Sequence, residues 1–333
     1  MPTTSHNQPS LAALYQGELR PILDELEQRR LRARKRALLS AAIIVPIAIV
    51  LALVLVRVIG PFGLIIPLAI GFIGWGFLVH GAMQEYRSYF KSQVIARLAK
   101  VIDPDLSYMP GGGISEREFS DSEIYRHRID RYRAEDRFSG RVGATAFHFS
   151  EVHAEYKTTT TDSKGNRRTT WHTIFRGIFF IADFNKDFQG QTFVLPDTAE
   201  RALGGLGRMM QGWGSKIDGR PGEMVRLEDP EFERLFAVQS TDQVEARYIL
   251  SPSLMERLTR FRNEIDAPVA IAFVNAQIYI AISTNKNYFE PPALWRSGAA
   301  LGQGDIEAYF KDVRLAEEIV EDLNLNLRIW SKQ

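Results

Sequence analysis

Two long uncharged stretches follow one another near the start of this chain and limit what it can fold into. Residues 37–56 hold no charged side chain, and residues 58–79 form a second stretch of the same kind. At 1.5 Å per residue, about 20 helical residues cross a hydrocarbon layer of roughly 30 Å. Arg57, Gly60 and Pro61 lie between the two stretches and are typical of a tight turn. Each stretch is therefore long enough to cross a membrane as a helix.

We predict a transmembrane helical hairpin over residues 37–82, with spans at about 37–57 and 58–80. A cleaved signal peptide fits less well, because its apolar run is shorter and begins near residue 1. A buried soluble helix also fits less well, because it is seldom apolar all round over such a length. Pro46 and Pro67 lie inside the spans, where membrane helices tolerate proline.

The hairpin is predicted to anchor the protein in the membrane rather than to conduct ions or protons. Neither uncharged stretch contains an ionisable side chain of the kind that marks an ion or proton path. A small channel or transport subunit stays an alternative, but it requires the spans to oligomerise. A homo-oligomer is therefore left open, and the lipid bilayer is the first expected partner.

Basic residues are concentrated at the two outer ends of the hairpin, whereas the turn holds a single arginine. A basic segment at residues 29–36 precedes the first span, and further basic residues follow the second. Cytoplasmic flanks of membrane helices carry an excess of lysine and arginine, so both termini are predicted to face the cytoplasm. The membrane-orienting residues in this prediction are Arg34, Lys35, Arg36, Arg87 and Lys91.

Helical segments are predicted on both sides of the hairpin. Residues 1–36 are expected to form a cytoplasmic amphipathic helix, packed on the protein's own domain, on the inner leaflet or on a partner. Residues 83–113 are expected to form a juxtamembrane helix followed by a glycine joint. Residues 120–138 mix arginine, tyrosine and acidic side chains. We interpret them as a solvated helix with internal ion pairs, not as a nucleic-acid surface.

Residues 114–333 are predicted to form a soluble cytoplasmic domain of the α+β class. Strand-like runs joined by turn residues recur along it, and we expect them to pair as successive hairpins in a largely antiparallel sheet with flanking helices. Gly177 is interpreted as the mark of a β-bulge. The expected strands are 147–156, 169–184, 192–195, 224–227, 237–240, 246–250, 269–274 and 278–282, with helices beginning near residues 252 and 304.

Composition excludes several classes of function. The chain has no cysteine, which excludes disulfides, thiolate catalysis and cysteine-ligated metal centres. The net charge is +1, so the molecule as a whole is not a polyanion binder, and no nucleic-acid partner is predicted.

Candidate catalytic residues are few. His153, Glu155 and His172 fall in neighbouring predicted strands, and His153 and Glu155 share a strand face. Such a group fits a histidine and carboxylate enzyme site, but it matches no metal-binding or nucleophile motif. We therefore predict no metal and no cofactor, and we favour a protein that is not an enzyme.

A glycine-rich region at residues 204–216 lacks the spacing of a phosphate-binding loop. Met209, Met210 and Trp213 make this region apolar. It is predicted to be a loop that contacts lipid headgroups or a partner.

Several short motifs resemble one known family when taken together. They are EDRFSG at 135–140, GIF at 177–179, FNK at 184–186, VLPD at 194–197, RLEDPEF at 226–232, FAV at 236–238 and DQVEARYIL at 242–250. With the two-helix anchor, they resemble the bacterial family catalogued as domain of unknown function number 3137, over about residues 30–290. The resemblance implies a bacterial membrane protein without an assigned activity, and it transfers no catalytic residue. On this basis we expect a multi-pass protein of the bacterial inner membrane with both termini in the cytoplasm.

The sequence leaves two functional hypotheses. The first is a membrane-anchored cytoplasmic binding or scaffolding module that engages a protein partner of unknown identity. The alternative is a membrane-tethered enzyme that uses the histidine and carboxylate group around His153. The two differ in whether those side chains meet in one pocket.

Overall fold

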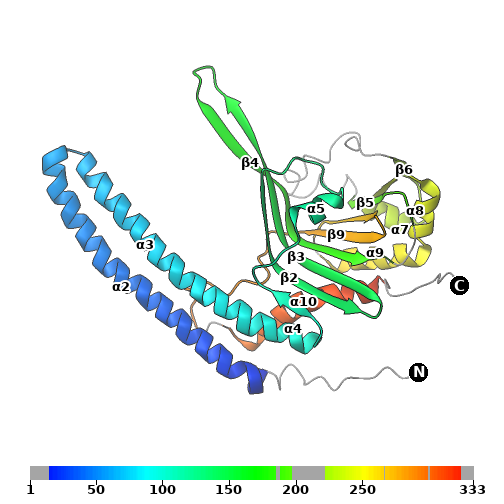
Figure 1. Cartoon of the computed structure of the whole chain (residues 1–333), viewed down its shortest axis with the longest axis horizontal. Helices are drawn as coiled ribbons and strands as arrows, with labels where there is room; N and C mark the ends of the chain where they lie inside the picture. Colours follow the sequence, from blue (N-terminus) through cyan, green and yellow to red (C-terminus); the bar gives the residue numbers. More distant parts are fainter. Residues whose placement is uncertain (1–14, 185–187, 197–221, 266, 299–300, 324–333) are drawn as a thin grey trace. The chain divides into compact units, whose positions relative to one another are not determined.

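The computed structural model describes residues 15–184, 188–196, 222–265, 267–298 and 301–323. The chain forms two compact units, which we describe separately. A helical unit contains residues 1–101 and 289–312, and a β unit contains residues 102–288 and 313–333. The predicted α+β class is confirmed: two long apolar helices precede a nine-stranded antiparallel sheet with flanking helices (Figure 1).

The helical unit is built around two long helices joined by a two-residue turn. Helix α2 runs without a break from the basic segment into the first apolar stretch, since no glycine interrupts it before Gly60. Gly60 has a φ of 67° and ends α2, and Pro61 is the N-cap residue of the second helix. The elements are η1 (Tyr15–Leu19), α2 (Arg20–Ile59), α3 (Phe62–Tyr89), η2 (Phe90–Ile95) and α4 (Ala96–Ile102).

Small residues let α2 and α3 approach closely. A Cβ added at Gly71 would lie 3.1 Å from the Cβ of Ala48, and Ala52 is buried. Near the turn, a Cβ at Gly63 would meet the backbone of α2. Small residues at such contacts are typical of helix pairs in membranes.

The outer surface of this helix pair is apolar. Both helices are long and apolar enough to cross a membrane, and only 11% of the residues in each apolar window are buried in the protein. Phe72 and Phe77 are 72% and 81% exposed. Exposure of such a surface to water is unfavourable, so this surface favours contact with an apolar environment.

The β unit contains one sheet in which all neighbouring strands are antiparallel, in the order β1-β2-β3-β4-β9-β8-β5-β7-β6. The β3–β4 hairpin extends past its neighbours, because residues beyond 156 of β3 pair with β4 alone (Figure 1). The strands are β1 (Ser107–Met109), β2 (Arg131–Val142), β3 (Thr145–Thr161), β4 (Arg167–Asp183), β5 (Thr192–Pro196), β6 (Glu223–Val225), β7 (Phe236–Ser240), β8 (Val269–Val274) and β9 (Gln277–Ser283).

Short helices flank the sheet. On the core face, Phe119 of α5 packs against Phe175 and Phe179 of β4, with ring centroids 5.8 and 4.8 Å apart. The side chain of Ser115 caps α5 in a capping box with Glu118. The helices are α5 (Glu116–Asp121), α7 (Pro230–Leu235), α8 (Gln243–Ile249), α9 (Pro252–Glu264) and α10 (Gln303–Asp322).

Two sequence predictions of local structure were wrong. Within the helix predicted over residues 120–138, only residues 120–121 are helical, at the end of α5, and residues 131–138 belong to strand β2. In β2, Tyr132 packs against the core while Arg131 and Arg133 point to the other face. Cross-strand pairing therefore outweighed the helical ion pairs. The strand predicted at 246–250 is instead helix α8, because the Asp242 side chain accepts hydrogen bonds from two backbone N–H groups at its start.

Two predictions about glycines also differ from the structure. The bulge predicted at Gly177 lies instead at Ile174, which pairs with no β3 residue because the register shifts between Ala154 and Glu155. The glycines of the predicted joint belong to the β unit. A Cβ at Gly113 would lie 2.4 Å from the Cβ of Ala134, so the chain packs tightly against β2 there.

Glu317 on α10 gives the β unit a specific pH dependence. Burial and the neighbouring Asp103 carboxylate are the main causes that raise the pKa of Glu317 from 4.5 to about 7. Between these pH values the folded chain holds a proton that the unfolded chain releases, so stability falls as pH rises. Because Glu317 is partly exposed, we expect the free energy of unfolding to fall by about 2 kcal/mol over this pH range.

We therefore expect Glu317→Gln to raise the thermal unfolding midpoint of the full chain in detergent at pH 8, with little effect at pH 4.5. Glu307→Gln, an exposed position on the same helix, is the control and should leave the midpoint unchanged. An equal response of both variants at pH 8 contradicts the assignment.

Candidate functional site: a charged cleft on the β sheet

An open cleft of about 560 Å³ lies over β2, β3 and β4 in the β unit. It lies on the face of the sheet opposite the α5 core, and the loop after β9 forms one of its walls. Its volume is in the range of small-molecule sites. The charged and histidine side chains that line it are Arg133, Glu135, Glu151, His153, Arg176 and Lys286.

These side chains are sorted into two rows by the strand register. Arg133 of β2 lies directly opposite His153 of β3, which lies directly opposite Arg176 of β4. Two residues further along, Glu135 lies opposite Glu151. Directly opposite residues share a face of the sheet, so a basic row and an acidic row lie side by side, about 7 Å apart along the strands.

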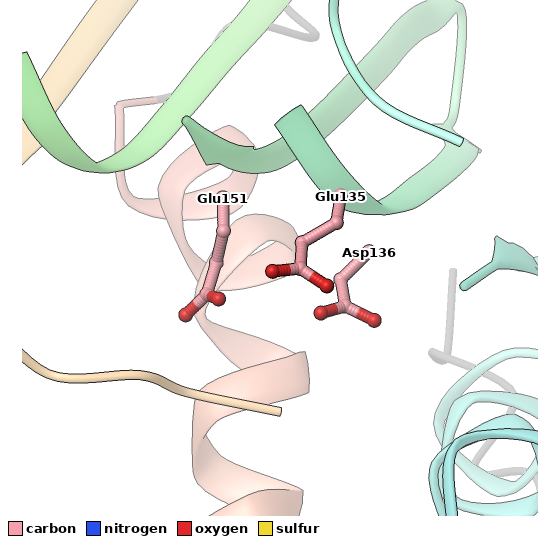
Figure 2. A group of neighbouring side chains, drawn as sticks. All are labelled: Glu135, Asp136 and Glu151. Atoms are coloured by element: carbon pink, nitrogen blue, oxygen red, sulfur yellow. The ribbon is translucent and has the colours of Figure 1, made fainter. Parts of the chain in front are cut away.

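The acidic row is extended by Asp136, which sits in a bulge of β2 with a φ of 59°. Figure 2 shows the carboxylates of Glu135, Asp136 and Glu151 extending in the same direction. One oxygen from each lies within 4.8 Å of the others. Asp136 is buried and accepts a hydrogen bond of 2.5 Å from the Tyr108 hydroxyl. Oxygen ligands at this spacing suit a hard cation, but acidic groups often cluster without one.

Two side chains of the basic row, Arg176 and His153, contact neighbouring polar side chains. The Arg176 guanidinium donates a hydrogen bond of 2.7 Å to the side-chain oxygen of Asn287. His153 lies 3.8 Å from a carboxylate oxygen of Glu155. Burial is the main cause that lowers the pKa of His153, and Glu155 opposes this shift whereas the arginines strengthen it. His153 is therefore mainly neutral near pH 7.

The structure does not bring the three predicted catalytic residues together. His153 and Glu155 lie on the cleft face, as their spacing indicated, and Glu155 also pairs with Arg131 at 3.1 Å. His172 lies on the opposite face, where its ring stacks on Tyr156 and hydrogen-bonds to a threonine of β3. A site that uses both histidines is therefore not formed.

The basic residues after the second span make specific contacts within the helical unit. Arg87 and Lys91 both pair with Glu290, at 2.9 and 3.1 Å. Lys91 is buried, and close by the Phe90 ring packs edge-on against Tyr309. These two basic residues hold Glu290 in addition to contributing positive charge.

The three orienting residues predicted before the first span are exposed. The Arg34 guanidinium lies 5.5 Å from the centre of the Trp295 ring, and Arg36 pairs with Glu85 at 3.2 Å. Lys35 is exposed. Their role in orienting the helices stays a prediction. The apolar loop of Met209, Met210 and Trp213 lies outside the described residues.

Comparison with known proteins gives a family match without an activity. Residues 173–325 match a family model described as a protein of unknown function (DUF3137), which confirms the resemblance to that family over this part of the chain. No curated protein matches the sequence. Among solved structures, the mycobacterial trehalose monomycolate transport factor A, TtfA, aligns with 68% of this chain and 95% of its own, at 7% identity and a TM-score of 0.34. A structural similarity this weak does not support any conclusion about function.

Proposed function

We propose that the chain is a membrane-anchored binding module. In this proposal α2 and α3 cross the bacterial inner membrane as a hairpin, and both termini and the β unit lie in the cytoplasm. The β unit binds or scaffolds a partner through its exposed surface, including the charged cleft. The proposal includes no enzymatic step, since His172 lies on the other face of the sheet from His153 and Glu155 and the predicted catalytic group is incomplete.

The observation that carries the proposal is the exposed apolar surface of the α2–α3 pair. Large apolar side chains such as Ile43, Val50 and Phe72 are more than half exposed along it. At about 25 cal/mol per Å² of apolar surface removed from water, lipid contact along two such helices is strongly favourable. The orientation rests on the basic flanks, because positive charge is retained on the cytoplasmic side.

Single-cysteine variants test the anchor and its direction, because the chain has no cysteine of its own. Val58→Cys beside the turn and Val244→Cys in the β unit form a matched pair, since the two valines are 74% and 77% exposed. In intact cells a membrane-impermeant maleimide should label position 58 only. Position 244 should react after permeabilisation. Labelling of position 244 in intact cells contradicts the orientation, and release of the chain from membranes by alkaline carbonate contradicts the anchor.

The same Val244→Cys chain tests for a partner when it carries a photoreactive maleimide in native membranes. We expect a cross-link to a second protein. A chain that cross-links only to itself contradicts the scaffolding part of the proposal and supports a homo-oligomer instead.

A further inference from the structure

The basic row of the cleft places two arginines on either side of a histidine. Arg133, His153 and Arg176 lie directly opposite one another on three adjacent strands. The two permanent positive charges of the row, those of Arg133 and Arg176, lie on the outer two of these strands, with His153 between them. The two arginines are about 10 Å apart at the backbone, since each strand spacing is close to 5 Å. An anion between them would be attracted by both guanidinium groups.

The donors of the row are available on the cleft side. Arg133 is exposed, and its guanidinium makes no hydrogen bond or ion pair to any residue that the structure describes. Asn287 accepts from one nitrogen of Arg176, which fixes that guanidinium but leaves other N–H groups of its fork. The ion pair of His153 is long, at 3.8 Å. The row therefore presents two planar forks with a histidine between them, a set suited to phosphate or carboxylate oxygens.

The floor of the cleft leaves room beside these donors. Gly177 lies directly opposite Val152, which is buried in the core on the other face, so neither position places a side chain on the cleft side. The cleft volume of about 560 Å³ accommodates a small molecule or a headgroup.

The acidic row limits the size of the anion. Glu135 and Glu151 lie about 7 Å from the basic row, which would repel a second negative group on the same ligand. An extended polyanion is therefore disfavoured. A single phosphate group whose remainder is neutral or cationic meets no such repulsion.

We infer that Arg133, His153 and Arg176 form a binding site for a compact phosphate group, carried either by a small soluble phosphate ester or by a lipid headgroup. The inference rests on the proposed function in so far as the β unit is a binding module. The inferred phosphate site does not depend on the side of the membrane on which the β unit lies.

Titration of the full chain with O-phosphoethanolamine tests the site. The protein is held in a maltoside detergent, in a buffer without phosphate or sulfonate, and calorimetry reports binding. We expect saturable binding that weakens with added salt, and a loss of at least about tenfold in affinity in Arg133→Gln and in Arg176→Gln. Arg133→Lys should bind less well than the parent chain, because an ammonium group lacks the fork.

Arg168→Gln is the matched control, because Arg168 is an exposed β4 arginine on the extended hairpin, outside the cleft. Its affinity should equal that of the parent chain. Circular dichroism checks that each variant folds, and Arg133→Gln removes no hydrogen bond or ion pair to the described residues. Absence of saturable binding, or equal affinity in the Arg133, Arg176 and Arg168 variants, overturns the inference.

Nanodiscs with and without phosphatidylethanolamine then distinguish the two sources. A lipid headgroup ligand should weaken O-phosphoethanolamine binding in the parent chain, whereas a soluble ligand predicts no effect of that lipid. The cysteine labelling gives an independent outcome. The phosphate site can fail while the anchor stands, and the anchor can fail while phosphate binding persists.

Discussion

Replacing Gly177 with alanine is expected to destabilise the β unit by at least about 4 kcal/mol. Gly177 has a φ of 147°, a conformation that residues with side chains rarely adopt. Its added Cβ would also lie 2.0 Å from the carbonyl oxygen of Ile282 on the neighbouring strand β9. Both strands lie inside the sheet, so relief of this contact must separate the central β4–β9 pair.

Gly165→Ala separates the two causes of this effect. Gly165 lies at the tip of the β3–β4 hairpin with a φ of 82°, but a Cβ there meets nothing within 4 Å. The Gly165→Ala substitution should lower the free energy of unfolding by only about 1–2 kcal/mol, from backbone strain alone. Thermal unfolding of the full-length protein in detergent, followed by circular dichroism in the β region, measures both variants. Equal midpoints for the two variants contradict the proposed clash at β9.

The fold class was predictable because it depends on local patterns. Uncharged stretches indicated the helix pair, and alternation with turn residues indicated the hairpins, including β8–β9 with its turn at Asn275 and Ala276. Strand β2 was missed because its arginines and acids are as compatible with helical ion pairs as with an exposed strand face. The pairing with β3 decides between them, and that pairing is not local.

The charged cleft was not predictable because it depends on strand register. Arg133, His153 and Arg176 are about twenty residues apart in sequence, and only the pairing of three strands aligns them. A bulge also determines on which face of the sheet His172 lies. In a regular strand His172 and Arg176, four residues apart, would share a face. The extra residue Ile174 places His172 on the other face, away from His153.

Replacing Arg30 with alanine is expected to destabilise the helical unit by about 3–5 kcal/mol, because a buried charged network loses its centre. Arg30 belongs to the basic segment that orients the hairpin, yet its side chain is only 2% exposed. It donates to the backbone carbonyl oxygens of Arg296, at 2.6 Å, and of Gly298, at 2.5 Å. It also pairs with Glu27 at 2.8 Å. The variant leaves these acceptors without their charged donor, so residues 289–298 should detach from α2.

Hydrogen exchange of residues 289–298 in the full-length protein measures this detachment. We expect much faster exchange in Arg30→Ala, and also in Arg30→Lys, because an ammonium group cannot reproduce the planar fork. Arg32→Ala is the matched control, since Arg32 pairs with Glu25 on the same helix but is 56% exposed. Loss of an exposed ion pair costs at most about 1 kcal/mol. Slow exchange in Arg30→Ala, equal to that in Arg32→Ala, contradicts the role of Arg30. A basic residue beside a membrane span would then contribute its charge alone, as the sequence pattern by itself suggests.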